Sequence, residues 1–172
     1  MPRASLYDTD YYAWTQDQAA TLRELAASSS NMRLDLSQLA EEVEDLGWNE
    51  LRTVSSFYQQ IVTHLLKIQF AAIRRPVRHW QREIMNFRLQ LAEDLTPSLE
   101  RKLLETLPTR YGLARNRAID GLECDQPDIA DILPREPPIA SIKSWGAAQL
   151  PAGCRLNRRI SAFLVETPLN CR

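Results

Sequence analysis

Glycine is scarce in this sequence, with five glycines in 172 residues, and the chain has few runs of β-branched residues. Tight β-turns rely on glycine and strands are rich in β-branched side chains, so a sheet-rich fold is not expected. Histidine is scarcer still, with two in the chain. A site with several histidine ligands is therefore excluded, and any metal here needs mainly carboxylates, which suit Mg²⁺ or Mn²⁺. We assign no residue to a metal.

The three cysteines, Cys124, Cys154 and Cys171, are odd in number and widely spaced. Their spacing matches neither a zinc motif nor a disulfide framework, so we expect free thiols. The sequence also has no Gly-rich phosphate loop, no nucleophile elbow and no Cys/His catalytic spacing. An enzymatic function therefore has no motif in its support, and the sequence does not identify a cofactor.

Long apolar stretches are absent as well. The longest segment without a formal charge runs from Thr53 to Leu66 and contains serine, glutamine and threonine. A membrane-spanning helix needs about 20 mostly apolar residues, so this segment is too short. The stretch MPRASLYDTDYY lacks the apolar region of a secretory signal. We therefore expect a soluble cytoplasmic protein that does not associate with a membrane.

The charges are balanced overall and uneven along the chain. The net charge is −1, which gives no argument for nucleic acid as a partner. Residues 1–133 carry 15 basic and 20 acidic side chains, whereas residues 134–172 carry six basic and two acidic ones. Half of the ten prolines also lie in 134–172. The sequence predicts a helical domain over 5–133 and a Pro-rich basic arm over 134–172, extended or partly disordered.

Within the domain, apolar residues recur at helical spacing. A first helix is expected from Thr9 or Asp10, either of which can cap it, to the polar run SSSN at 28–31. A second is expected from about 36 to 73 as one helix bent near Gly47, with two helices as the alternative. Its predicted buried stripe consists of Leu39, Val43, Leu46, Val54, Phe57, Ile61, Leu65 and Ile68.

Proline then marks the remaining segments. Pro76 ends the second helix and can open a third, with Trp80 on its buried stripe. Pro97 precedes a fourth helix, which Pro108 is expected to break or kink. The predicted fold is all-α, an up-down bundle of about four helices with an irregular Pro-rich C-terminal arm.

Two acidic residues of the second helix are candidates for a functional site. On a helical wheel Glu42 falls at the edge of the predicted apolar stripe, and Glu50 falls inside it if the helix is straight. A carboxylate at a core edge must be paired, bind a metal or shift its pKa, because an unpaired buried charge is costly. The alternative is a solvated acidic face, and both interpretations stay open at this stage.

The segment THLLKIQF at 63–70 contains the other two catalytic candidates. The wheel places His64 on the core side and Lys67 at the edge, where its ammonium can reach water. His64 is either a neutral core histidine hydrogen-bonded to a carbonyl or carboxylate, or a group for proton transfer or metal ligation with Glu42 or Glu50 as its partner. We take Glu42, Glu50, His64 and Lys67 as the catalytic candidates.

The run RRPVRHWQR contains several basic residues around Pro76. Arg75 and Arg78 are candidates for binding phosphate or an acidic partner, and Trp80 offers a plane for stacking or packing. The alternative is a basic turn that pairs with the acidic helix. A run this short on a nearly neutral protein does not favour nucleic acid.

Several stretches of the chain together resemble a known family. They are YDTDYYAWTQDQAATLR, LDLSQLAEEVEDLG, HLLKIQF, the Arg-rich turn before Trp80, REI at 82–84 and PSL at 97–99. Over residues 5 to 133 they resemble the bacterial domain-of-unknown-function family twenty-nine. The matching positions are Asp8, Asp10, Trp14, Asp35, Glu41, Glu42, Glu44, Gly47, His64, Lys67, Arg75 and Trp80. Ile68 stands where the family usually has an aromatic residue, and 139–172 departs from the family pattern.

The resemblance implies a small helical bacterial protein of uncharacterised function. Amphipathic helices and the lack of a catalytic motif favour an interaction or regulatory module with a protein partner or as a homodimer. The alternative is an enzyme or small-ligand-binding bundle, in which glutamate, His64, Lys67 and Arg75 line a polar pocket, with or without a divalent metal.

Overall fold

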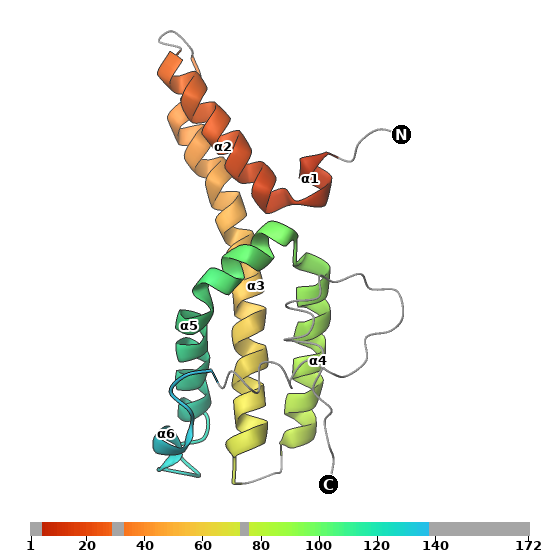
Figure 1. Ribbon diagram of the computed structural model, residues 1–172, viewed down its shortest axis with the longest axis vertical. Helices are drawn as coiled ribbons and strands as arrows, with labels where there is room; N and C mark the ends of the chain where they lie inside the picture. Colours follow the sequence, from red (N-terminus) through yellow and green to blue (C-terminus); the bar gives the residue numbers. More distant parts are fainter. Residues whose placement is uncertain (1–4, 29–32, 73–75, 138–172) are drawn as a thin grey trace. The chain divides into compact units, whose positions relative to one another are not determined.

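A computed structural model of the chain describes residues 5–28, 33–72 and 76–137. Helices account for most of these residues, and none of them is in a strand. In chain order the helices are α1 (Leu6–Thr9), α2 (Tyr11–Ser28), α3 (Leu36–Phe70), α4 (Val77–Asp94), α5 (Pro97–Asp120) and α6 (Ile129–Ile132) (Figure 1). The prediction of an all-α bundle with about four main helices is confirmed, and the four are α2 to α5.

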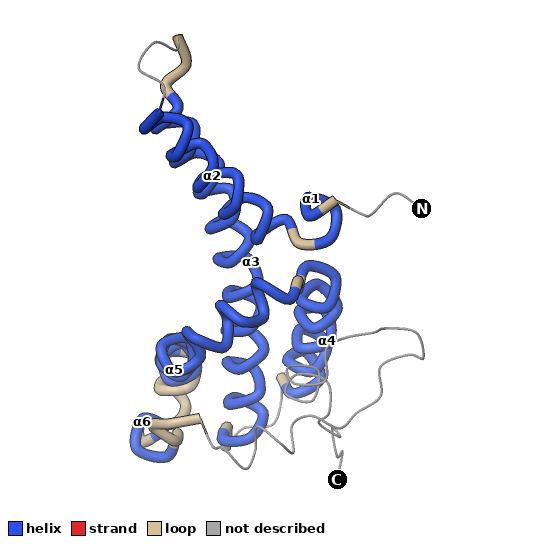
Figure 2. The backbone as a smooth tube through the Cα atoms, turned by 45° about the horizontal axis from the view of Figure 1, so that its top comes forward, coloured by secondary structure: helices blue, strands red, loops and turns tan. Residues whose placement is uncertain are grey.

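The helices form two compact units, which we describe separately. The hairpin unit comprises the described residues of Met1–Val54 and Asp94–Glu105. The bundle unit comprises the described residues of Ser55–Glu93 and Thr106–Arg172. Both α3 and α5 contribute one part to each unit. Figure 2 shows the described chain as helices joined by short loops.

In the hairpin unit, α2 and the first part of α3 pack as two antiparallel helices (Figure 1). Gly47 of α3 is buried where the helices meet, and a Cβ atom there would clash with Oγ1 of Thr15 and lie 3.3 Å from its Cβ. Helix α3 is continuous through this position, so the sequence was right to favour one helix. Gly47 serves the close approach of α2 rather than a break.

Two aspartates begin helices in this unit. Asp35 precedes α3, and its Oδ1 accepts a hydrogen bond from the backbone N–H of Gln38 at 3.0 Å. Asp10 precedes α2 and is buried, with Oδ1 accepting from the N–H of Ala13 at 3.1 Å. Asp10 also accepts from Oγ1 of Thr96 at 2.9 Å and from the N–H of Ser98 at 3.0 Å. One carboxylate therefore caps α2 and joins it to the start of α5.

In the bundle unit, the second part of α3, α4 and the second part of α5 run side by side in an up-down order (Figures 1 and 2). Neighbours cover α3 on several sides here, so that even Thr63 is buried and donates from Oγ1 to the carbonyl of Ala114 at 3.2 Å. The predicted stripe is buried at Ile61 and Leu65. The larger buried set of this part of α3 is Ser55, Tyr58, Gln59, Ile61, Val62, Thr63, Leu65 and Leu66.

The third and fourth predicted helices correspond to α4 and α5. Helix α5 continues through Pro108, which is exposed, so of the expected break or kink the break is not found, and the kink stays a prediction. After α6 the carbonyl of Pro134 accepts hydrogen bonds from the hydroxyl of Tyr111 at 2.9 Å and from Nε of Arg115 at 3.2 Å. The rest of the predicted arm, 138–172, lies outside the described residues. Among the helices of the described part, none has the length and apolar character needed to span a membrane.

Candidate functional site

The two acidic candidates belong to the hairpin unit and face solvent to different degrees. Glu42 is exposed, and its Oε1 accepts a hydrogen bond from Nε2 of Gln38 at 3.0 Å. Glu50 is half-buried. Neither carboxylate is buried in the core, so neither needs a metal or a buried cation to compensate its charge.

His64 lies on α3 in the bundle unit and is half-buried rather than sealed in the core. Its ring stacks on Phe87 of α4, with centroids 6.3 Å apart and ring planes 10° from parallel. The Nδ1 atom is enclosed and has no hydrogen-bond partner among the described residues. The expected partner for a core histidine, a carbonyl or carboxylate at Nδ1, is therefore not found in the described part of the chain.

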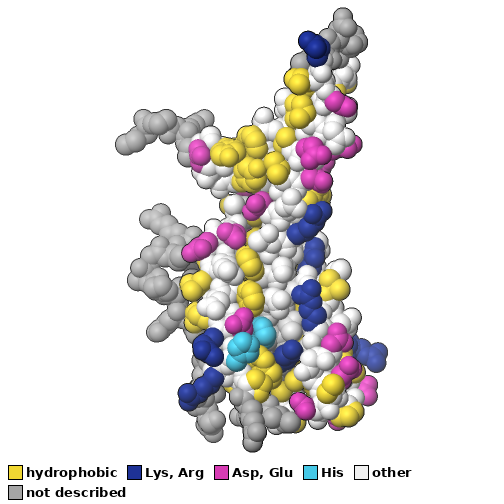
Figure 3. Space-filling model, turned by 180° about the vertical axis from the view of Figure 1, so that it is seen from behind, with side chains coloured by type: hydrophobic (Ala, Val, Ile, Leu, Met, Phe, Trp, Pro, Cys, Tyr) yellow, Lys and Arg dark blue, Asp and Glu magenta, His cyan; other side chains and the backbone are white. Residues whose placement is uncertain are grey.

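Charge and burial both act on His64. Burial is the largest cause that lowers the pKa of His64 below its usual 6.5, and the nearby charges of Lys67 and His79 lower that pKa further. The carboxylate of Glu83 acts in the opposite direction. The carboxylate whose charge acts on the pKa of His64 is thus that of Glu83 on α4, and not that of Glu42 or Glu50. The two histidines and neighbouring charged groups gather on one face of this unit (Figure 3).

Lys67 follows His64 by one helical turn and is also half-buried. Its side chain lies against Gly121 at the end of α5, where a Cβ atom would clash with Nζ and lie 2.8 Å from Cε. Burial lowers the pKa of Lys67, and the nearby carboxylate of Asp120 partly offsets this. Among the described residues Lys67 donates no hydrogen bond from its side chain.

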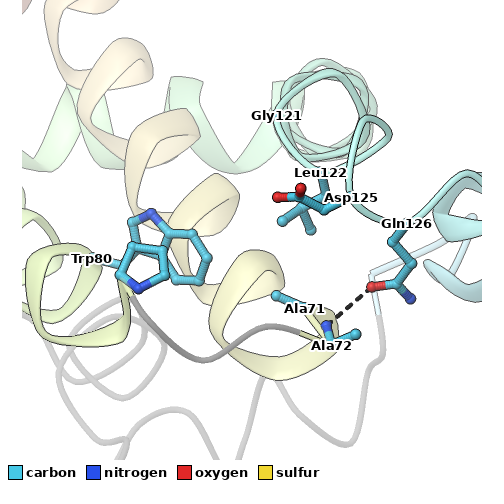
Figure 4. A pocket seen from close by; sticks show the side chains of 8 residues that line it. Ala71, Ala72, Trp80, Gly121, Leu122, Asp125 and Gln126 are labelled. Carbon is cyan, nitrogen blue, oxygen red and sulfur yellow. Dashed lines mark hydrogen bonds between the residues drawn. The ribbon is translucent and has the colours of Figure 1, made fainter.

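A small pocket of about 100 Å³ opens beside Gly121. Trp80 forms one side, and Leu122 and Asp125 come from the turn after α5 (Figure 4). The side chain of Gln126 accepts a hydrogen bond from the N–H of Ala72 at 3.0 Å, which joins this turn to the end of α3. The complete lining consists of Ala71, Ala72, Pro76, Trp80, Gly121, Leu122, Asp125 and Gln126.

The three candidates for binding, Arg75, Arg78 and Trp80, differ in their surroundings. Arg75 lies outside the described residues. Arg78 is exposed at the start of α4, and Trp80 is buried and lines the pocket. The structure thus brings His64, Lys67 and Trp80 into the bundle unit, and it places Glu42 and Glu50 in the hairpin unit.

Sequence analysis missed the groups that surround these residues. Glu83 has a usable signal, because it follows His79 by four positions and so shares its face of α4. Gly121, Asp125 and Gln126 come from a turn whose position depends on the packing of α5, which no local pattern reveals. Within the described ranges, no three histidine, cysteine, aspartate or glutamate side chains cluster closely enough to hold a metal ion.

The hairpin unit has large apolar side chains at its surface. Leu25 of α2 is 41% exposed, and Leu39 and Leu46 of α3 are 39% and 46% exposed. The prediction that Leu39 and Leu46 belong to the buried stripe is therefore wrong. The buried side of α3 here is made by Leu36, Ala40, Gly47, Leu51 and Val54, of which Val54 belongs to the predicted stripe. The small residues Ala40 and Gly47 face α2 because the two helices approach closely there. Leu39 and Leu46 lie beside this contact and remain exposed.

These exposed leucines lie on the same side of the hairpin. At about 100° per residue, Leu25 is offset about −110° from the buried side of α2, and Leu39 and Leu46 are offset about −80° and −100° from that of α3. When two antiparallel helices face each other, residues whose angular offsets have the same sign lie on the same side of the helix pair. Arg23 and Glu44, whose offsets are both positive, form an ion pair and so confirm this geometry.

We call this surface the outer face, and it consists of Leu25, Leu39, Glu42, Leu46 and Glu50. Glu42 lies at its edge by the same phase argument, and Glu50 lies within it. Figure 3 shows hydrophobic side chains gathered over α1 and the start of α2 and again further along the hairpin. The group over α1 and the start of α2 includes Tyr7 and Trp14, whose rings pack edge to face with their centroids 4.8 Å apart.

This chain is similar to a solved structure and matches the model of a protein family. No curated protein matches the chain. Among solved structures, the chain is similar to an α-helical protein of unknown function from Rhodospirillum rubrum ATCC 11170, with 26% identity and a TM-score of 0.59, over 80% of this chain and 87% of that one. A family model described as "Domain of unknown function DUF29" matches residues 6–144. The match spans most of the sequence, and the chain therefore belongs to the DUF29 family.

Proposed function

We propose that this protein is an interaction or regulatory module whose outer face binds a protein partner. The observation that carries the proposal is the exposure of Leu25, Leu39 and Leu46 together on one side of a two-helix hairpin. Single exposed leucines are common on protein surfaces, whereas a row of them on one side is typical of a docking site.

The packing of the hairpin explains why Leu25, Leu39 and Leu46 remain exposed to a partner. Its small buried residues Ala19, Ala40 and Gly47 let α2 and α3 approach closely, so the exposed leucines are not needed to fill the hairpin core. Burying a leucine side chain contributes about 1.5–3 kcal/mol, which a partner helix on the outer face would gain at each position.

Photo-crosslinking in cells that produce the protein tests this proposal. A photoreactive amino acid is placed at position 46 in one variant and at position 113 in a control, because Leu46 and Leu113 are 46% and 45% exposed. We expect a specific protein adduct from position 46 and none from position 113, with the adduct identified by mass spectrometry. Equal adducts from both positions, or none from position 46, would contradict the proposal.

A second candidate function is small-ligand binding in the bundle unit. It is supported by the half-buried ammonium of Lys67 against Gly121, at the edge of the pocket that Trp80 and Asp125 line. A ligand with an acceptor group would stabilise that ammonium, and Trp80 would pack against its apolar part. The pocket volume of about 100 Å³ suits a molecule of a few non-hydrogen atoms.

Thermal unfolding in the presence of small carboxylates, phosphates and amines tests this second function. A ligand that binds the pocket should raise the melting temperature of the wild type. The shift should be lost in Lys67→Met and changed in Asp125→Asn, whereas Asp128→Asn, a charge change outside the pocket lining, should leave it intact. A shift that survives Lys67→Met would show that the ligand binds elsewhere.

A further inference from the structure

The charges on the outer face have one sign. Glu42 and Glu50 are its charged members, and both are acidic. The three arginines of residues 11–54 are placed elsewhere: Arg23 pairs with Glu44, Arg52 donates to Oδ1 of Asn49 at 2.8 Å, and Arg33 precedes α3. The outer face is thus apolar along its middle and negative along α3.

The surroundings strengthen this negative character. Residues 11–54 contain eight acidic and three basic side chains, for a net charge of −5. Four of the acidic residues lie close together on α3, at Glu41, Glu42, Glu44 and Asp45. Of these, Glu44 is neutralised by Arg23. The field of the others extends over the outer face and attracts a positively charged partner.

A second copy of this chain fits the face less well than a basic partner does. Two outer faces packed together bring the carboxylates of Glu42 and Glu50 in one copy close to those in the other. No arginine or lysine on the described outer face can compensate them. Like charges brought together in an interface oppose association, so the charge pattern disfavours a symmetric dimer through this face.

We infer that the partner of the outer face is a basic amphipathic helix. Its apolar side lies on Leu25, Leu39 and Leu46, and its lysine or arginine side chains lie beside Glu42 and Glu50. A third helix laid along a hairpin in this way completes a small helical bundle, which is a common mode of peptide recognition. This inference rests on the proposed function, because it names the chemistry of the partner that the outer face binds.

Two designed peptides test the partner chemistry. Both have 18 residues, the length of α2, and carry leucines at helical spacing on one side. One has lysines at the remaining positions and the other has glutamates. Fluorescence anisotropy of the labelled lysine peptide should show saturable binding to the full-length protein at one peptide per chain. The glutamate peptide should bind at least tenfold more weakly.

Matched variants show whether the lysine peptide uses the outer face. Leu46→Ser should weaken binding roughly tenfold or more, and Leu113→Ser should leave it unchanged. Glu42→Gln combined with Glu50→Gln should weaken binding roughly three- to tenfold and reduce its salt dependence. Glu41→Gln removes a charge from the residue before Glu42, which lies about 100° further round α3 and points away from the outer face, so it should have a smaller effect than Glu42→Gln alone.

The outcomes separate this inference from the proposed function. Equal effects of Glu41→Gln and Glu42→Gln would show non-specific attraction and overturn the inference. Failure of the lysine peptide to bind, or equal binding of both peptides, would also overturn it. If position 46 still gives a specific crosslink in cells, the proposed function stands and only the partner chemistry is wrong. A crosslink from position 46 to a second copy of the chain would likewise leave the proposed function standing and show that the partner is not a basic helix.

Discussion

The side chain of Lys67 lies across Gly121, so closely that a Cβ atom at position 121 would clash with its Nζ. The contact joins α3 to the end of α5 inside the bundle unit. It explains why glycine suits position 121 without any appeal to unusual backbone geometry. Lys67 is half-buried here, and this burial lowers the pKa of its ammonium.

Gly121→Ala should move the lysine with little loss of stability. The clashing atoms are the far end of a flexible side chain, so the ammonium can turn to solvent, and the expected cost is roughly 0.5 kcal/mol. The pKa of Lys67 should then rise toward 10.5, which an NMR titration of the lysine side-chain signals measures. An unchanged pKa of Lys67 in Gly121→Ala would show that Gly121 does not hold the lysine in place.

Gly47→Ala should cost much more, because its neighbour is rigid. The new Cβ meets Oγ1 of Thr15, a buried side chain whose hydroxyl donates to the carbonyl of Tyr12 at 2.8 Å. Overpacking costs about 1–3 kcal/mol, and alanine regains up to about 1 kcal/mol of helix propensity. The net loss in the free energy of unfolding should be about 1–2 kcal/mol in urea denaturation.

The same substitution should cost less when Thr15 is shortened. In a Thr15→Ala background, the clash with Oγ1 is gone and only the contact of 3.3 Å with the Cβ atom of residue 15 remains, so helix propensity should offset most of the cost of Gly47→Ala. If Gly47→Ala destabilises both backgrounds equally, the close approach of Thr15 to Gly47 is not the reason for the glycine.

Asp10→Ala should destabilise the protein more than Asp35→Ala does. Asp35 caps one helix, and removing such a cap costs about 1 kcal/mol. Asp10 is buried and accepts hydrogen bonds from Ala13, Thr96 and Ser98, so its loss should cost about 2–3 kcal/mol. Urea unfolding of the two variants measures both losses, and similar values would argue against the double role of Asp10.

His64 should make stability depend on pH. Because the folded-state pKa of His64 lies below 6.5, the unfolded chain takes up this proton first as pH falls. The free energy of unfolding should therefore drop as pH falls from about 6.5 through the lowered pKa. His64→Gln should remove this slope. His79→Gln should keep most of it, since burial is the largest cause of the shift. An unaltered slope in His64→Gln would refute this origin.

Much of the fold follows from local signals in the sequence. The caps at Asp10 and Asp35 and the helix starts at Pro76 and Pro97 depend on neighbouring residues, and the structure has helices beginning beside each of them. Of the break or kink expected at Pro108, the break is not found, because tertiary packing decides whether a helix continues past a proline.

The site was harder to predict because a helical wheel shows phase and nothing else. Taking Leu39 as the centre of the buried stripe ignored the small residues Ala40 and Gly47, which face α2 because they let it come close. The wheel also hides the rise along the helix, so Glu42 and Glu50 were treated as neighbours of His64. The carboxylate that does act on the pKa of His64, that of Glu83, comes from another helix.

The most direct test of the central claim is an NMR titration of the ¹⁵N-labelled protein with the lysine peptide. Our account predicts that the amide shift changes concentrate around Leu25, Leu39 and Leu46. Signals near Arg23 and Glu44, on the opposite side of the hairpin, should change little. Changes that centre on the Arg23–Glu44 side, or in the bundle unit around His64, would contradict the assignment of the outer face as the docking site.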